Sequence, residues 1–289
     1  IGFDCGGVTF IHEDHQGMLW IGGLYAGVKR YQPVTGAMSY HTLGNSNFGG
    51  NDLWSIHESQ DGTLWVGGWG GANKVISSEN FFPLLTFSEE SFVNSIVEGP
   101  NSGLWISTGS GEGLIHIDRL NGTISQYLSR ENDPNSIIAN FITRIDSDAA
   151  GNLWLIYGYG GVSQYDISEN KFTTFFDDQE SALNVILKTY ITADQNEQLW
   201  VGTFGSGLFQ LDPRTESIIR NFTHNPNDST SLSDDRVYVI EESRNGDLWV
   251  GTNNGLNFID RNQENGSTPI RIQRYLPERV IVATFEDDN

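Results

Sequence analysis

The chain has 289 residues, of which 37 are acidic and 16 are basic, so its formal net charge is −21. A chain this acidic repels phosphate backbones, which excludes nucleic acid as an expected partner. The single cysteine, Cys5, excludes a disulfide framework and a cysteine-based zinc site. No apolar run approaches the ~18 residues that a membrane helix needs, so we expect no direct membrane insertion.

A Leu-Trp pair recurs along the whole chain at intervals of 40 to 49 residues. A period of this size, written in short strands, is typical of a β-propeller. An aliphatic residue stands nine positions before each of these tryptophans, and another stands twelve positions before it in every unit except the fifth, which has Lys188. We predict that the six repeated tryptophans are structural and fill the wedge between blades: Trp20, Trp65, Trp105, Trp154, Trp200 and Trp249.

Each repeat reads as four short strands joined by three turns. Asp61-Gly62 and Asn245-Gly246 supply the positive φ angles that a tight turn between the first two strands requires. The second strand is apolar at consecutive positions, as in residues 19–21, which indicates a sheet buried on both faces. A glycine-rich turn, a third strand, a polar turn and a fourth strand complete the unit.

In chain order, these signals predict one β-propeller domain over residues 1–289, all-β and built of four-stranded antiparallel blades. Residues 279–289 read as the first strand and turn of a seventh repeat, so the prediction is six full repeats plus that first strand. We therefore expect the chain to be a segment of a seven-bladed or larger propeller. The predicted blades cover approximately residues 7–43, 51–88, 92–129, 140–177, 186–223 and 236–276.

The sixth repeat carries a family resemblance. Residues 237–260, which read VYVIEESRNGDLWVGTNNGLNFID, resemble the two-component regulator propeller repeat, as does the preceding linker at 224–235. A shorter form of that linker stands at 132–137. The resemblance extends over essentially the whole chain, but it is looser in the third and fourth units, where Ser107-Thr108 and Ile156-Tyr157 replace a Gly-Gly or Gly-Thr step.

The resemblance implies a function. Propellers of this family form the periplasmic, extracytoplasmic sensor part of bacterial two-component receptors, and many respond to glycans. The full-length receptors carry a histidine kinase, hybrid kinase or diguanylate cyclase output, so the expected partner is the remainder of the receptor chain. The family has no universal catalytic residues, which implies that this segment is not an enzyme and needs no cofactor.

A ligand site is predicted at the turns between second and third strands. In a propeller these turns share one face with the connections between blades, and the centre of that face is concave. Aromatic rings among amides suit a carbohydrate, whose C–H faces stack while its hydroxyls need donors and acceptors. Trp69 is the first candidate because it lies outside the structural series and between glycines. The predicted ligand-binding residues are Trp69, Tyr25, Tyr157, Tyr159, Phe204, Asn253 and Asn254. The alternative is that these rings only cover neighbouring turns.

Three functions stay open at this point. The first is a sensor that binds an oligosaccharide or another small solute, and the second is a protein–protein or dimerisation propeller without such a ligand. The third is an enzyme similar to virginiamycin lyase, which would need a cluster of histidines and carboxylates around a metal. His12 and His57 occupy equivalent repeat positions rather than forming such a cluster, and the acidic turns lack the spacing of a calcium loop, so no metal site is predicted.

Overall fold

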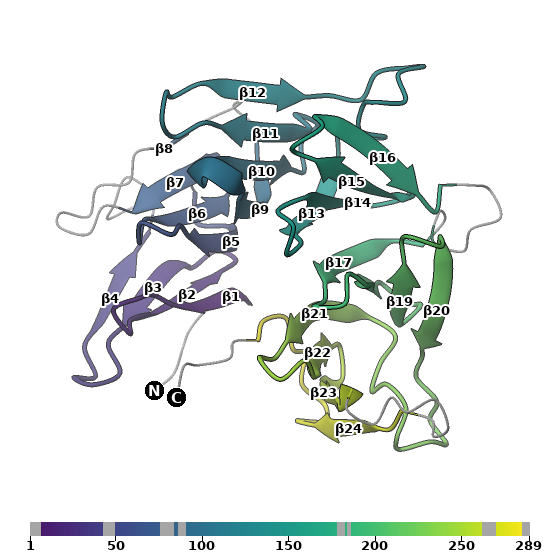
Figure 1. Cartoon of the computed structure of the whole chain (residues 1–289). Helices are drawn as coiled ribbons and strands as arrows, with labels where there is room; N and C mark the ends of the chain where they lie inside the picture. The colour runs from purple at the N-terminus through teal and green to yellow at the C-terminus, as the bar shows by residue number, and fades with distance from the viewer. Residues whose placement is uncertain are drawn as a thin grey trace. The chain divides into compact units, whose positions relative to one another are not determined.

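The computed structural model describes residues 7–42, 50–75, 84–85, 91–177, 183, 186–261 and 270–284, and it is shown in Figure 1. These residues form six antiparallel sheets of four strands, each sheet with its strands in chain order. The all-β fold predicted from the repeat is confirmed, and each sheet is one blade of a β-propeller. The described chain divides into two compact units, the first extending to Glu131 and including Ala139–Ile145, the second containing Asn132–Ile138 and the residues from Asp146 on.

Three blades belong to the first unit. Blade 1 consists of β1 (Val8–Glu13), β2 (Leu19–Gly23), β3 (Gly27–Tyr31) and β4 (Met38–His41). Blade 2 consists of β5 (Leu53–Glu58), β6 (Leu64–Gly68), β7 (Gly71–Val75) and β8 (Leu84–Leu85). Blade 3 consists of β9 (Val93–Glu98), β10 (Leu104–Thr108), β11 (Leu114–Ile117) and β12 (Ile124–Tyr127), with a short 3-10 turn at Pro100–Ser102.

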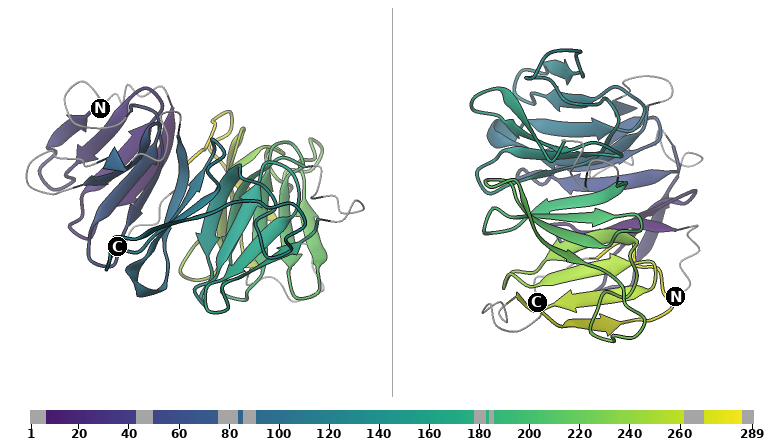
Figure 2. Two further views of the ribbon diagram at one scale, coloured as in Figure 1. Left: turned by 90° about the horizontal axis from the view of Figure 1, so that it is seen from above. Right: turned by 90° about the vertical axis from the view of Figure 1, so that its right-hand side faces the viewer.

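The other blades lie in the second unit, except that β13 begins in the first. Blade 4 consists of β13 (Ile142–Ser147), β14 (Leu153–Tyr157), β15 (Val162–Asp166) and β16 (Lys171–Phe175). Blade 5 consists of β17 (Lys188–Ala193), β18 (Leu199–Thr203), β19 (Leu208–Asp212) and β20 (Ser217–Phe222). Blade 6 consists of β21 (Val237–Glu242), β22 (Leu248–Thr252), β23 (Gly255–Ile259) and β24 (Ile272–Tyr275), the yellow sheet of Figure 2.

Four of the repeated tryptophans, Trp20, Trp65, Trp154 and Trp200, lie in hydrophobic cores between successive blades, whereas Trp249 is half-buried. Trp20 packs with Leu53 and Val66 of blade 2, and Trp200 packs with Val237 and Val250 of blade 6. Each core therefore joins the second strand of one blade to the first two strands of the next. Because both faces of an inner strand are covered in this way, consecutive apolar residues are the expected pattern.

An aspartate six residues before the tryptophan anchors the first turn in three blades. In blade 5 the Asp194 carboxylate accepts the indole N–H of Trp200 at 2.9 Å and the backbone N–H of Asn196 at 2.8 Å. Asp14 and Asp148 make the same bonds in blades 1 and 4. The buried indole N–H, which would be costly to leave unpaired, is thus satisfied by the turn that precedes it.

Lys188, the exception to the aliphatic pattern, is completely buried at the start of β17. Its Nζ donates to the carbonyl oxygens of Gly160 at 2.6 Å, Leu183 at 2.8 Å and Ile186 at 3.2 Å. Burial lowers the pKa of this amine to about 8. The side chain fills the aliphatic position and uses all three of its donors to hold the connection that leads into blade 5.

The residues after β24 lie against blade 6. The backbone N–H of Ile281 donates to the carbonyl of Thr252 at 2.9 Å, and a Cβ on Gly251 would come within 2.8 Å of Ile281 Cγ2. Gly202 faces Val237 of the next blade in the same way, at 2.7 Å. Ile281 is thus placed like the first strand of a following blade, which is the partial seventh repeat that was predicted. Residues 285–289 of that prediction lie outside the described residues.

Candidate ligand-binding site

Within each unit, the turn after a second strand lies beside the connection that enters the next blade. In the first unit, Gly27 N–H donates to the carbonyl of Asn51 at 3.0 Å and Gly70 N–H to that of Ser91 at 2.8 Å. In the second, Gly205 N–H donates to the carbonyl of Asp235 at 3.0 Å. Side chains of a turn and of the neighbouring connection can therefore contribute to one surface.

Most of the predicted ligand-binding side chains are on the surface. Tyr25 is 80% exposed, Tyr159 65%, Phe204 50% and Trp69 47%. Asn254 is exposed and its side-chain oxygen accepts the backbone N–H of Glu278, whereas Asn253 is half-buried.

Tyr157 requires a correction, because its ring is only 1% exposed. It is the last residue of β14 and not part of the following turn, and its hydroxyl donates to Ser163 Oγ at 3.1 Å. Burial raises the pKa of the Tyr157 hydroxyl. A ligand on the surface cannot stack on this ring.

Trp69 belongs to a group of four aromatic rings, which we call the aromatic platform: Trp54, Trp69, Phe92 and Phe141. Phe92 lies at its centre, parallel to Trp69 within 8° at a centroid separation of 6.0 Å. Trp54 is tilted against Phe92 at 5.5 Å, and Phe141 meets it edge-on at 6.5 Å. Trp69 and Phe141 are half exposed, and Phe92 is half-buried. Three of these rings were not among the predicted residues.

Backbone pairing seats Phe92 in the platform. Trp69 and Phe92 form an antiparallel bridge, and Gly109 N–H donates to the carbonyl of Phe92 at 3.1 Å. A Cβ on Gly109 would lie 2.0 Å from Phe92 Cε2, so the ring occupies space that only a glycine leaves free. The backbone N–H of Phe92 donates to Ser110 Oγ at 3.2 Å, and Ser110 in turn donates to Glu112. Polar groups therefore border the rings.

The second unit has a smaller pair at the equivalent place. Phe204 meets Tyr238 edge-on at 6.3 Å, and the Tyr238 hydroxyl lies 3.4 Å from the Asn253 side-chain oxygen. Two of the predicted residues, Phe204 and Asn253, are brought together by Tyr238, which was not predicted.

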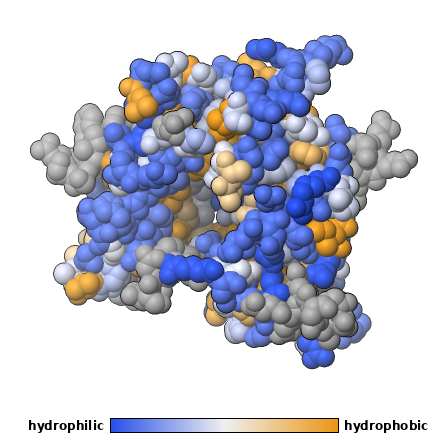
Figure 3. Space-filling view, viewed as in Figure 1, coloured by the Kyte–Doolittle hydropathy of each residue, from blue (hydrophilic) through white to orange (hydrophobic). Residues whose placement is uncertain are grey.

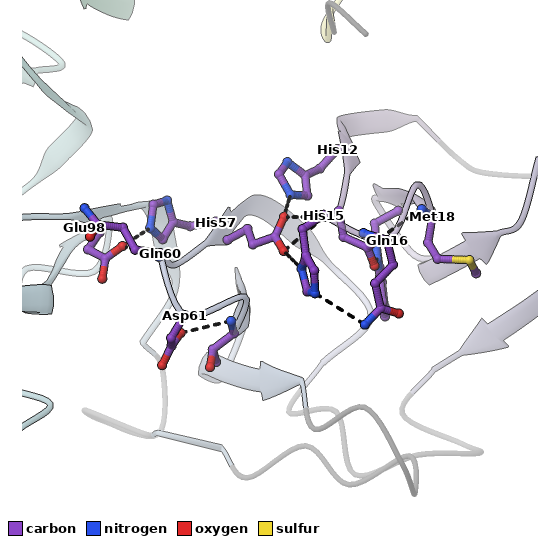
Figure 4. Close-up of polar contacts among 12 residues, drawn as sticks. His12, His15, Gln16, Met18, His57, Gln60, Asp61 and Glu98 are labelled. Carbon is purple, nitrogen blue, oxygen red and sulfur yellow. Dashed lines mark hydrogen bonds and ion pairs between the residues drawn. The ribbon is translucent and has the colours of Figure 1, made fainter. Parts of the chain in front are cut away.

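A cluster of histidines and carboxylates lies at the first turns of blades 1 to 3 (Figure 4). His12 Nε2 is 3.0 Å from Glu58 Oε2, and His15 Nδ1 bonds to the other oxygen of the same carboxylate. His57 Nε2 lies 4.0 Å from Glu98 Oε2. The hydrogen bond to Glu58 raises the pKa of His15. Burial alone would raise the pKa of Glu58, but the bonds from His15 and His12 outweigh it and lower that pKa.

The histidines do not form a site like that expected of a lyase. His116 stacks on Trp105 at 4.2 Å, His224 Nδ1 bonds to the carbonyl of Leu232 at 2.8 Å, and His41 is buried in β4. Among the described residues, no three His, Cys, Asp or Glu side chains are placed to hold a metal ion. The part of the chain that the structure describes also has no helix of the length and hydropathy needed to cross a bilayer.

The repeat around Trp249 is the part of the chain that matches a known family. Residues 231–254 match the family described as two component regulator propeller. The resemblance predicted from the sequence is confirmed for this stretch. An 88-residue segment is also 31% identical to histidine kinase P4 of Formosa agariphila, covering 30% of this chain and 6% of that protein.

Solved structures share the fold. The extracellular domain of the putative hybrid two component system BT4673 from B. thetaiotaomicron matches 97% of this chain with a TM-score of 0.74 and 23% identity. That of BT3049 from the same organism matches 75% with a TM-score of 0.62 and 25% identity. The chain spans 38% and 29% of these two structures. Virginiamycin B lyase from Staphylococcus aureus matches 96% of this chain, with a TM-score of 0.72 and 17% identity.

Proposed function

We propose that this chain is the extracytoplasmic sensing part of a bacterial two-component receptor and that it binds an oligosaccharide. The observation that carries the proposal is the match of 97% of the chain to the extracellular domain of a hybrid two component system. The family match at residues 231–254 and the similarity to a histidine kinase support the same role. In this proposal the domain lies in the periplasm and its partner is the remainder of the receptor chain.

The ligand assignment rests on the chemistry of the surface. The exposed aromatic side chains stand beside hydroxyl, amide and carboxylate groups, a combination that suits sugar rings and their hydroxyls. The role is binding and not catalysis, because the described histidines are engaged in other contacts away from these rings. Binding would alter signalling by favouring one of two receptor states, either through blade packing or through the geometry of a homodimer.

A thermal-shift screen of oligosaccharides on the purified domain tests the proposal. A ligand that binds only the folded state raises the melting temperature in proportion to the logarithm of its concentration. We expect at least one oligosaccharide to give a shift that saturates with concentration. If no member of a broad panel does so while the protein is folded, the sensing role for a glycan is wrong, and a dimerisation propeller becomes the better description.

A further inference from the structure

The six repeats of this chain serve as controls for one another. A ring that the fold requires should recur at its repeat position, as the Trp of each Leu-Trp pair does. Where one repeat carries a large ring and the others carry small or polar residues, the blade forms without that ring. Such a ring needs another explanation.

At two positions of the aromatic platform the fold does not require a ring. The position of Trp69, four after the repeated Trp, is filled in the other repeats by Leu24, Gly109, Gly158, Phe204 and Asn253. The position of Phe92 and Phe141, thirteen before the repeated Trp, is filled elsewhere by Gly7, Asp52, Leu187 and Arg236. Blades therefore form with glycine, aspartate or arginine at these positions, yet within the first unit Trp69, Phe92 and Phe141 bring three rings together.

The exposure of these aromatic rings to water is energetically unfavourable. Trp69 and Phe141 are each about half exposed, and each contacts Phe92, with ring centroids 6.0 and 6.5 Å from the Phe92 centroid. Exposed aromatic groups of this kind mark binding sites more often than they mark ordinary surface. The face drawn in Figure 3 is mainly hydrophilic, with hydrophobic residues scattered over it.

The charge beside the aromatic platform limits the class of ligand that can bind there. Ser110 joins Phe92 to Glu112, so an acidic side chain borders the rings. The whole chain carries a net charge of −21. A ligand with carboxylate or sulfate groups would meet repulsion here, whereas the hydroxyls of an uncharged sugar can donate to the Glu112 carboxylate.

We propose that Trp54, Trp69, Phe92 and Phe141 form a stacking site for an uncharged oligosaccharide, with Ser110 and Glu112 as its polar contacts. The proposal rests on the sensing function proposed above and assigns that function a place and a class of sugar. Successive sugar rings lie along Trp69, Phe92 and Phe141. Tyr25, Tyr159 and Phe204 have no part in this site.

Isothermal titration calorimetry on the whole chain tests the site. The probes are neutral hexasaccharides (cello-, manno-, xylo- and laminari-) and an oligogalacturonate as the anionic counterpart. We expect one neutral sugar to bind, and Trp69→Ala and Phe141→Ala each to weaken its binding about tenfold or more. The matched control is Tyr40→Ala, which removes a ring of similar exposure, 49%, from β4 of blade 1 and should leave the affinity unchanged. Glu112→Lys should reduce the preference for neutral over anionic sugar.

The possible failures are distinguishable. A sugar that keeps its affinity in the Trp69→Ala, Phe141→Ala double variant leaves the sensing function standing and overturns the site. Tighter binding of the oligogalacturonate overturns the charge assignment. A change in sedimentation from dimer to monomer in the Trp69→Ala variant, with unchanged sugar binding, would make the platform a contact between copies. If none of the sugars binds the folded protein, the proposed function itself is contradicted.

Discussion

Glu58 and Glu242 occupy the same position in their repeats, seven residues before the Trp, but their surroundings differ. Glu58 in blade 2 receives His12 and His15 from blade 1, and its pKa is lowered. Glu242 in blade 6 shares Arg261 with Asp194 of blade 5. Burial, together with repulsion from Asp194, raises the pKa of Glu242 despite that arginine. One repeated carboxylate therefore responds to pH in two opposite ways.

The difference comes from the numbers of basic and acidic side chains that meet at each contact between blades. Arg261 is 9% exposed, lies 2.7 Å from Asp194 and 3.0 Å from Glu242, and its guanidinium covers the Trp200 ring. One cation serves two acids there, of which Asp194 is fully buried and Glu242 is half-buried. Between blades 1 and 2, two imidazoles serve one acid, and His15 is open to solvent. Removing a permanent charge that is buried between two blades is costly because its partners are left unpaired, whereas titratable groups that reach solvent change their charge with pH.

The largest expected effect is that of Arg261→Met. The substitution keeps most of the side chain's apolar contact but leaves the buried Asp194 and the half-buried Glu242 without their cation. We expect the free energy of unfolding to fall by about 3–5 kcal/mol. Urea denaturation followed by tryptophan fluorescence measures it. The control, Arg214→Met, removes an exposed arginine paired with Asp212 and should change stability by less than about 0.5 kcal/mol. Equal losses of stability in the two variants would mean that the ion pairs of Arg261 stabilise the fold no more than an exposed ion pair does.

Glu58→Gln should have a smaller effect that depends on pH. The lowered pKa of Glu58 stabilises the fold above its ordinary value of 4.5, and the raised pKa of His15 stabilises it below 6.5. The loss should therefore be greatest between these values, smaller than that of Arg261→Met, and should decrease toward either extreme. Urea midpoints measured from acid to alkaline pH give the profile. Glu13→Gln, at the same position of blade 1, is the matched control, and an identical profile for both variants would contradict the assignment.

Glu242→Gln should behave in the opposite way to Glu58→Gln. Because its raised pKa means that the folded state holds this proton more tightly than the unfolded state, Glu242 lowers stability as the pH rises above 4.5. The neutral amide removes that cost, so we expect a change of less than about 1 kcal/mol at neutral pH, with any difference in the direction of greater stability. The same denaturation series measures it. A loss as large as that of Arg261→Met would show that Glu242 is fully ionised and required.

The smallest expected effect is that of His15→Gln. The raised pKa of this exposed imidazole contributes stability below 6.5, which is lost as the pH rises through the folded-state value. The variant should melt at a slightly lower temperature than the wild type in mildly acidic buffer and at the same temperature in alkaline buffer. About 1 M salt, which screens exposed charges within about 3 Å, should abolish the difference. A difference that survives the salt would point to packing and not to charge.

The blade repeat was predictable because the fold places the same demand on every unit. A Leu-Trp pair and an aliphatic residue nine positions earlier are required wherever two sheets pack, so they recur. Tyr157 was misassigned because its equivalents, among them Thr108, Thr203 and Thr252, are small, which hides the fact that this position closes a strand. An alignment of the six repeats shows that Tyr157 stands at the last position of a second strand, which would have predicted that its side chain is buried.

The candidate site was harder to predict, because it is built from departures from the repeat. Trp69 was predicted as an isolated aromatic residue, but Phe92 and Phe141 precede the first strands and resemble ordinary connection residues. Trp69 and Phe92 come together because a backbone bridge joins the turn after β6 to the connection that enters blade 3, and the spacing of the repeat does not reveal this bridge. The ion pairs between blades depart from the repeat as well. Arg119 of blade 3 pairs with Asp61 of blade 2, and Arg261 of blade 6 pairs with Asp194 of blade 5, but the two arginines stand at different distances from Trp105 and Trp249.

Gly109 gives the platform an unusual vulnerability. Because Phe92 fills the space where a Cβ would stand, one added methyl group in the turn after β10 would displace the central ring while every aromatic residue stayed in the sequence. Binding could thus be gained or lost among related chains by a change that a comparison of their aromatic residues would overlook. Alanine or glycine at this single place is the feature by which to sort them.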